Sequence, residues 1–346
     1  MAHTFKRIIV SRTDKIGDLV LSIPSFFMLK KMYPEAEITV LVRNYNYNIV
    51  KNLPYIDRVV KIDDYRKKEL LEKIPYFNAD VFIALYVDDY VMQLAKASKA
   101  KIKIGPLSKL KSFFTFNKGV LQKRSKSLKH EAEYNLDLIK KLDKNRYEEV
   151  LEINTKINLD EENIAAADKF FKDNNIDGKI LVVNPFMGGS AKNITDLQYA
   201  NILKKVIDKV SNLNVIITAH ISDEIRGIDL LKEIDRKNVY LFANGGELLN
   251  IGAIIDRCNV YFGGSTGPTH IASSLQKSIV ALYPNKPTQS PTRWGIYGNE
   301  DVTYIVPDKN PFTKENYKHK NFDNYNDCIE SQIVDAIIER LNRWKY

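Results

Sequence analysis

Three glycine-containing stretches of the chain combine side chains that can hold a phosphate group or move a proton. They are RTDKIGDLVLSIP at residues 12–24, NPFMGGSAKN at 184–193 and GGSTGPTH at 263–270. Each follows a short apolar run, so each is expected where a strand passes into a helix. Glycine lets the backbone approach an anion, and the amides and positive dipole at a helix N-terminus attract negative charge. The second and third stretches therefore predict anion-binding loops.

The side chains of these two loops suit a diphosphate. The hydroxyl groups of Ser190, Ser265 and Thr266 can donate hydrogen bonds, and Lys192 carries a full positive charge. His270 follows Thr266 by one helical turn, so both side chains can face one ligand. Two simpler interpretations stay open at this point, a plain connecting loop and a packed or capping histidine.

Asp18 in the first stretch is a candidate general base, because a carboxylate that faces a cleft can accept a proton from a hydroxyl group. The alternative is a carboxylate that only complements the dipole of the helix it begins. The sequence contains neither a GxxxxGK[ST] loop nor a GxGxxG after its first strand. These omissions argue against an ATPase and against an ordinary NAD-binding enzyme.

A parallel sheet in each half of the chain would position the three stretches. In such a sheet, ligands bind beyond the carboxyl ends of the strands, at the switch point where the strand order reverses. We expect two domains, at 1–165 and 166–324, and a final helix at 325–346 that packs back on the first domain. One helix is expected from about 18 to 33, and Thr195 is expected to cap another. The expected strands are KRIIVS, EITVLV, DRVVKI, ADVFIALYV and AKIKIG in the first half, and KILVVNPF, NVIITAH, NVYLF, NVYFGG and SIVALYP in the second.

The composition is that of a soluble globular protein, with 44% hydrophobic and 27% charged residues. Its longest fully apolar run, VFIALYV at 81–87, is far shorter than the roughly 20 residues that cross a bilayer. The N-terminus lacks the apolar region of a signal peptide. Cys258 and Cys328 do not have the spacing of a metal site. We therefore expect a cytoplasmic protein with both thiols reduced.

The formal net charge of +9 is unevenly placed, because residues 96–129 contain many lysines and no acidic residue. Such a field attracts an anionic partner, whether nucleic acid, anionic lipid headgroups or a phosphorylated glycolipid. A solvated lysine-rich surface is the alternative.

Taken together, the motifs resemble glycosyltransferase family 9, whose best-studied members are lipopolysaccharide heptosyltransferases. Residues 12–42, which begin with RTDKIGDLVLSIP, are similar to the family's opening strand, loop, helix and second strand. HEAEYNLDLIKKL is similar to the family's helix near the end of the first domain. NPFMGGSAKN resembles the family's donor loop, GGSTGPTHIASSL its D-[ST]-G-x-x-H motif, and RWGIYG its late RWGPYG element.

The resemblance implies an α/β protein of the GT-B class, with two Rossmann-like doubly wound domains that face a central cleft. It implies an inverting, metal-independent transfer of a heptose from a nucleotide sugar, ADP-heptose, bound by the second domain. The acceptor, an anionic glycolipid of the lipopolysaccharide core at the inner membrane surface, would bind the first domain. No cofactor and no nucleic acid are expected.

The same resemblance assigns roles to individual residues. Asp18 matches the proposed base, and Glu224 lies near the expected ribose-binding acid, with Asp223 as the rival in register. Ser265 replaces the aspartate that usually begins the third motif, so the donor sugar can differ from that of the heptosyltransferases. The remaining donor-binding expectations are Ser190, Lys192, Thr266, Gly267 and His270, and the acceptor-binding expectations are Lys15, Lys109, Lys111 and Arg124.

Two other functions stay open. One is a family 9-like transferase that uses another donor. The other is a non-catalytic protein that binds nucleotide sugars or polyanions, since single-stranded nucleic acid could use the lysines together with Phe113, Phe114 and Phe116.

Overall fold

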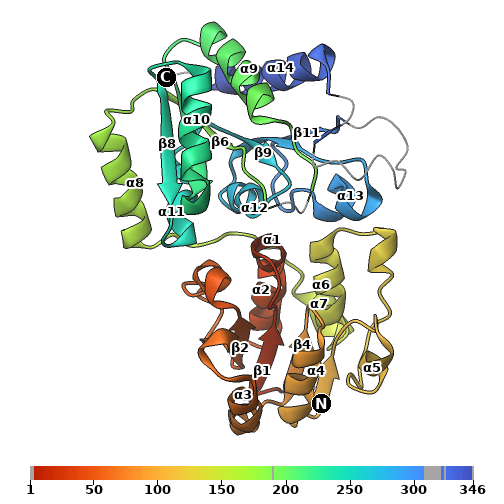
Figure 1. Cartoon of the computed structure of the whole chain (residues 1–346). Helices are drawn as coiled ribbons and strands as arrows, with labels where there is room; N and C mark the ends of the chain where they lie inside the picture. The colour runs from red at the N-terminus through yellow and green to blue at the C-terminus, as the bar shows by residue number, and fades with distance from the viewer. Residues whose placement is uncertain (1–3, 189–190, 308–320, 323–324, 345–346) are drawn as a thin grey trace. The chain divides into compact units, whose positions relative to one another are not determined.

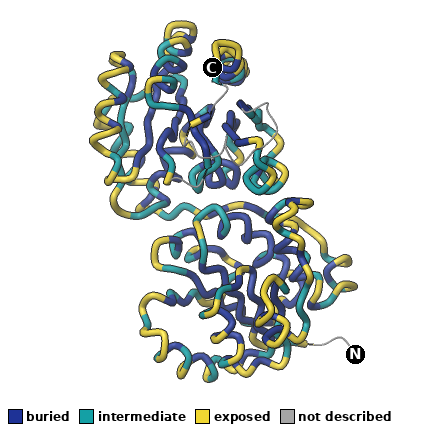
Figure 2. The backbone as a smooth tube through the Cα atoms, turned by 45° about the vertical axis from the view of Figure 1, so that its right-hand side comes forward, coloured by how far each residue is buried: buried dark blue, intermediate teal, exposed yellow. Residues whose placement is uncertain are grey.

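The computed structural model of the chain describes residues 4–188, 191–307, 321–322 and 325–344. The chain divides into two compact units, Met1–Asn158 and Leu159–Tyr346. Each unit is a parallel sheet covered by helices on both faces (Figure 1). In Figure 2 the strands at the centre of each unit are buried, and the helices around them expose their outer faces. No helix within the described ranges is both long and apolar enough to cross a membrane.

The first unit holds a five-stranded sheet in the order β3-β2-β1-β4-β5, in which all neighbours are parallel. The strand β1 lies at the centre, so the switch point lies between β1 and β4. Strand bounds are β1 Arg7–Ser11, β2 Glu37–Val42, β3 Arg58–Lys61, β4 Val81–Ala84 and β5 Ile102–Ile104. Helix bounds are α1 Ile16–Val20, α2 Ile23–Met32, α3 Lys67–Lys73, α4 Asp89–Ala97, α5 Leu110–Phe113, α6 Glu131–Lys140 and α7 Lys144–Glu149.

The side chains of this sheet alternate between two apolar cores. Ile9, Leu41 and Phe82 point to the face covered by α3 and α4, where they pack with Leu70 and Leu94. The intervening strand residues point to the opposite face, because successive side chains of a strand alternate. The helices α2 and α6 pack against each other, which brings residues far apart in the sequence together beside β1.

The second unit holds a six-stranded parallel sheet in the order β11-β10-β9-β6-β7-β8. Its switch point lies between β6 and β9, so the loops after these two strands are neighbours. Strand bounds are β6 Lys179–Asn184, β7 Leu213–His220, β8 Val239–Asn244, β9 Val260–Gly264, β10 Ser278–Leu282 and β11 Val302–Ile305. Helix bounds are α8 Glu161–Asp173, α9 Asp196–Lys209, α10 Glu224–Ile234, α11 Leu248–Asp256, α12 Gly267–Ser274, α13 Pro291–Trp294 and α14 Asp327–Arg343. Short 3-10 helices complete the two units, at η1 Asn44–Ile49, η2 Ile62–Asp64, η3 Ile74–Phe77, η4 Arg124–Lys126, η5 Ile221–Asp223 and η6 Pro287–Gln289.

The structure corrects one expectation about helices and shows where the last helix is buried. The segment expected as one helix from about 18 to 33 is two helices, α1 and α2, that meet at Leu21 and Ser22. Pro24 near the start of α2 has no amide hydrogen, so a new helix begins there at little cost. The C-terminal helix α14 buries Ile333, Ile337 and Leu341 in the core of the second unit. The packing of this helix on the first domain stays a prediction.

Candidate active site

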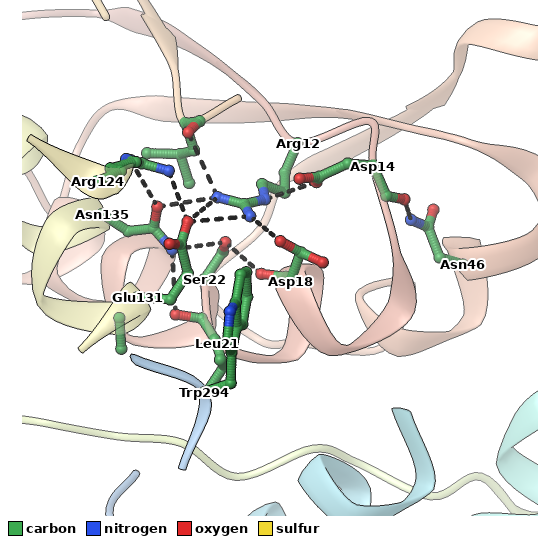
Figure 3. Close-up of polar contacts among 12 residues, drawn as sticks. Arg12, Asp14, Asp18, Leu21, Ser22, Asn46, Arg124, Glu131, Asn135 and Trp294 are labelled. Carbon is green, nitrogen blue, oxygen red and sulfur yellow. Dashed lines mark hydrogen bonds and ion pairs between the residues drawn. The ribbon is translucent and has the colours of Figure 1, made fainter. Parts of the chain in front are cut away.

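A buried arginine occupies the carboxyl end of the central strand of the first unit. Arg12 directly follows Ser11, the last residue of β1, and its side chain is only 1% exposed. Its Nε atom donates to Oδ1 of Asp14 at 2.6 Å, and its Nη2 atom donates to Oδ1 of Asp18, also at 2.6 Å (Figure 3). One guanidinium therefore holds two carboxylates from the loop and the helix that follow it.

The opposite end of the same guanidinium is held by residues distant in the sequence. Nη1 donates to Oδ1 of Asn135 at 2.9 Å and to the Leu85 carbonyl at 3.3 Å. Nη1 and Nη2 both approach Oε1 of Glu131, at 3.4 and 3.3 Å. Glu131 and Asn135 lie four residues apart on α6, so they project from one face of that helix. The packing of α6 on α2 thus completes the environment of Arg12.

Arg124 joins this cluster as a second cation. Its Nη1 atom donates to Oε1 of Glu131 at 2.5 Å, and its Nη2 atom lies 3.4 Å from Oδ1 of Asn135. Gln122 orients it by accepting a hydrogen bond from Nε at 2.8 Å. The structure therefore brings Arg124 into the same hydrogen-bonded cluster as Asp18, two residues that were assigned to acceptor binding and to proton transfer.

Asp18 is positioned by its backbone as well as by Arg12. The Ser22 hydroxyl donates to the Asp18 carbonyl at 2.8 Å, and Asn135 Nδ2 donates to the Ser22 oxygen at 3.1 Å. The Asp18 side chain is 14% exposed, so a substrate hydroxyl can reach it. The break between α1 and α2 is thus tied to the same cluster that orients the carboxylate.

Asp14 was not singled out from the sequence, yet its environment shifts the pKa of its carboxyl group strongly. Burial, together with the nearby charge of Asp18, raises the pKa of Asp14 to about 7, although Arg12 acts in the opposite direction. Burial alone would lower the pKa of Arg12, but Asp14, Asp18 and Glu131 together raise it above its usual value. Arg12 therefore remains charged while Asp14 titrates near neutral pH.

The three lysines expected to bind the acceptor have separate environments. Lys15 is exposed immediately before α1, and Lys109 is exposed immediately before α5. Lys111 on α5 is exposed, and its Nζ atom lies 3.8 Å from Oδ1 of Asp89 at the start of α4. Their roles in acceptor binding stay predictions.

In the second unit, the loop from β6 to α9 is anchored by Asn193. Its amide donates to the Pro185 carbonyl at 2.6 Å, and its Oδ1 atom accepts from the Tyr199 hydroxyl at 2.9 Å. Lys192 beside it is 3% exposed. Thr195 caps α9 as expected, since its hydroxyl accepts from the Gln198 amide at 3.2 Å. Ser190 lies outside the described residues.

The loop from β9 to α12 is built around a hydroxyl cluster. Thr269 bonds the Gly264 carbonyl and lies 3.2 Å from both the Tyr261 and the Thr266 hydroxyls. Thr266 is the residue before α12, Gly267 begins that helix, and the Thr266 side chain makes no capping bond to it. His270 is buried in the first turn, where its amide approaches the Thr266 carbonyl at 3.3 Å.

The two loops of the second unit touch each other at the switch point. A Cβ atom placed on Gly264 would lie 2.6 Å from the Met187 sulfur and 3.7 Å from Oδ1 of Asn193. A side chain at this position would thus displace the Met187 side chain, so glycine permits the close approach of the two loops. Ser265, which follows, interacts with the buried Tyr283 hydroxyl, which donates a hydrogen bond to the Trp294 carbonyl at 2.7 Å.

The start of α10 borders the same edge of the sheet. Glu224 is its first residue and is exposed, whereas Asp223 before it is half-buried. Arg226 in the same turn makes a bidentate ion pair with Asp196 on α9, at 2.6 and 2.7 Å, and its guanidinium lies 4.8 Å from the Phe186 ring centroid. These contacts fix α10 against the loop that contains Lys192.

Comparison with known proteins agrees with this architecture. Residues 78–325 match the model of the family described as glycosyltransferase family 9 (heptosyltransferase). A Haemophilus influenzae protein with a provisional glycosyltransferase name is 28% identical over 297 residues, which cover 84% of this chain and 85% of that protein.

Solved structures share the fold across the whole chain. A family 9 glycosyltransferase from Veillonella parvula has a TM-score of 0.82 at 19% identity, with 99% of each chain covered. The Escherichia coli ADP-heptose lipopolysaccharide heptosyltransferase II has a TM-score of 0.78 at 15% identity, covering 98% of this chain and 99% of that one. E. coli heptosyltransferase WaaC with ADP has a TM-score of 0.70 at 14% identity, covering 96% and 99%. The two Rossmann-like units therefore form a GT-B fold.

Proposed function

Since the chain belongs to glycosyltransferase family 9, the heptosyltransferase family, we propose that it moves a heptose or a related sugar from a nucleoside diphosphate to a glycolipid hydroxyl. ADP-heptose is the proposed donor, because the family 9 enzymes of similar fold include an ADP-heptose lipopolysaccharide heptosyltransferase and a heptosyltransferase with bound ADP. The proposed acceptor is a phosphorylated glycolipid of the lipopolysaccharide core.

The observation that carries the proposal is the Asp18 carboxylate, held 2.6 Å from a buried Arg12 and still accessible to a substrate. As the acceptor oxygen bonds to the anomeric carbon, its proton passes to Asp18. The bond from that carbon to the diphosphate breaks on the opposite side, and its electron pair leaves with the diphosphate. The displacement inverts the configuration of the sugar.

The leaving diphosphate needs positive partners, and the second unit supplies them without a metal ion in this proposal. Lys192 would provide a full charge, Thr266 a hydroxyl donor, and the first turn of α12, which begins at Gly267, amide donors. Ser190, His270 and Glu224 would complete the donor site. The reaction requires these groups and Asp18 to act on the same pair of substrates.

The test is the isosteric substitution Asp18→Asn. Loss of a general base costs about 10² to 10⁴ in rate, so we expect kcat to fall within that range while calorimetry shows unchanged donor affinity. Asp63→Asn is the matched control, because Asp63 pairs with Arg43 outside the Arg12 cluster. Wild-type turnover retained in Asp18→Asn, or donor binding without any turnover in wild type, would refute the proposal.

The donor is tested separately, because Ser265 interacts with Tyr283 where the family usually has an aspartate. Calorimetric titration with ADP-, UDP-, GDP- and CDP-sugars should show selective binding of ADP-heptose. Selective binding of another nucleotide sugar would keep the transferase assignment and change the donor.

The acceptor side of the proposal includes contact with the cytoplasmic face of the inner membrane. Leu110, Phe113 and Phe114 on and beside α5 are 78%, 54% and 79% exposed, next to the exposed Lys109 and Lys111. Apolar side chains among cations suit an anionic lipid surface. The triple variant L110S/F113S/F114S should release the protein from vesicles of phosphatidylglycerol, while the control I225S, at a 76% exposed position of α10, should remain bound.

A further inference from the structure

We propose that Asp14 and Asp18 form a carboxyl pair that binds one proton between them, and that Asp18 serves as the base only after the pair has lost it. In this inference Asp14 is a positioning residue that acts through Asp18. The inference rests on the proposed function, because Asp18 is taken as the group that receives the acceptor's proton.

The geometry of the guanidinium brings the two carboxylates together. The Nε–H and Nη2–H bonds of arginine leave one edge of a flat fork in parallel, and a single carboxylate usually accepts both. Here Asp14 accepts from Nε and Asp18 accepts from Nη2, each at 2.6 Å. Two carboxylates therefore accept hydrogen bonds from a guanidinium edge that usually binds a single carboxylate, and their oxygen atoms are held close to each other (Figure 3).

The rest of the cluster does not supply the missing positive charge. The far end of Arg12 is used by Glu131, a third carboxylate. Arg124 makes its closest contact with Glu131, at 2.5 Å, rather than with the pair. Two guanidinium groups thus face three carboxylates, and like charges at short distance favour retention of one proton.

Two tyrosines and Arg43 also lie near the pair, and each of them has a pKa raised further from neutrality. The Tyr45 hydroxyl bonds the Asp14 carbonyl, and burial, with the charge of Asp14, raises the pKa of Tyr45. The pKa of Tyr86 is also raised, first by burial and then by Asp88 and Asp14. Arg43 approaches the Thr13 carbonyl and pairs with Asp63, which helps to keep it charged. The raised pKa of Asp14, about 7, is consistent with a proton held by the pair.

The proton balance of one turnover follows. In the ionised pair, Asp18 takes the proton of the acceptor hydroxyl as that oxygen bonds to the sugar and the diphosphate leaves with the electron pair. The proton then lies between Asp18 and Asp14, which stabilises it relative to a lone carboxylic acid. It must pass to solvent before the next turnover, so the ionisation of the pair sets the lower pH limit of activity.

The experiment is a pH profile of kcat/KM for wild type and Asp14→Asn. Wild-type activity should rise through about pH 7. In Asp14→Asn the amide cannot hold the proton, so the acidic limb should move down by at least about one pH unit. We also expect kcat near pH 8 to fall about tenfold, because protonated Asp18 has lost its partner. The variant should therefore retain a larger share of its maximal activity than wild type at about pH 5.5.

A merely structural role gives a different result. Equal loss of activity at every pH, with an unmoved acidic limb, would overturn the inference. Asp14→Glu keeps a carboxyl group and should keep the limb near neutrality, and Asp63→Asn should leave it unchanged. The inference would also be overturned if the acidic limb of the Asp14→Glu pH profile shifted as far as that of Asp14→Asn.

A readout without turnover separates this inference from the proposed function. A carboxyl group whose pKa is raised in the folded state stabilises at low pH, and this stability is lost as pH rises toward the folded pKa. Between about pH 4 and 7, the unfolding midpoint of wild type should therefore fall relative to that of Asp14→Asn. Parallel midpoints would refute the pair even if the enzyme is active, and diverging midpoints with no transferase activity would refute only the proposed function.

Discussion

Replacing Arg12 by methionine tests the central cluster most directly. Methionine has a similar length and no charge, so Asp14, Asp18 and Glu131 lose the guanidinium that donates six hydrogen bonds in this structure. Removing one partner of a buried ion pair costs about 3 to 5 kcal/mol, because the other charge stays buried without compensation. We expect Arg12→Met to lower the free energy of unfolding by that amount, a large part of the roughly 5 to 15 kcal/mol that stabilises a domain.

The loss should depend on pH in one direction. Without Arg12, the carboxyl groups hold protons more tightly in the folded variant than in folded wild type, so the folded variant binds more protons. Its stability relative to wild type therefore falls as pH rises. The difference in unfolding free energy should be larger at about pH 8 than at about pH 5.5.

The assay is urea unfolding of the full chain followed by circular dichroism, with calorimetric donor binding as a check that the second unit is intact. Arg43→Met is the matched control, because its pair with Asp63 has similar length, 2.6 Å, but side chains that are 36% and 31% exposed. Exposed pairs contribute about 0 to 1 kcal/mol. The reasoning fails if Arg12→Met is no more destabilising than Arg43→Met at about pH 8, or if its effect is larger at the lower pH.

Three further predictions concern the second unit. Gly264→Ala should raise the donor KM about tenfold in steady-state assays, because its Cβ would press on the methionine sulfur of the β6–α9 loop. Lys192→Met should lower kcat about 100-fold in steady-state assays, and an effect below threefold would exclude it from leaving-group stabilisation. Burial raises the pKa of Cys258 to about 12 while Cys328 is exposed, so a thiol reagent at about pH 8 should label one cysteine in the native protein and both in urea.

Ten of the eleven strands in the described residues, and the loops at the switch points, could be predicted from local sequence; the edge strand β11 was not among the expected strands. Strands such as β1 and β6 are short runs of branched apolar residues. The loops that follow them lie at the carboxyl edge of the sheet, where ligands bind in parallel sheets. Thr195 could be predicted as a helix cap because the capping hydroxyl and its target amide are three residues apart.

The Arg12 cluster could not be predicted in the same way. Arg12 meets Glu131 and Asn135 across sequence separations of 119 and 123 residues, so only the packing of α6 on α2 joins them. Asp14 carried no sequence signal beyond its place in the loop, and its proximity to Asp18 arises because both carboxylates accept from the same edge of the guanidinium. The break at Ser22 likewise depends on its bonds to Asp18 and Asn135, which local helix preference does not report.

The position of α14 affects the order in which a nascent chain is completed. The first unit ends at Asn158, so it is made before residues 159–346, whose addition takes about 10 to 40 s. The second unit is completed later, because α14, the helix that contacts β9, β10 and β11, comes last among its described elements. Until α14 has been made, the apolar surface that it covers beside α9 stays exposed, and chains that stall before α14 should depend on chaperones more than chains that stall just after the first unit.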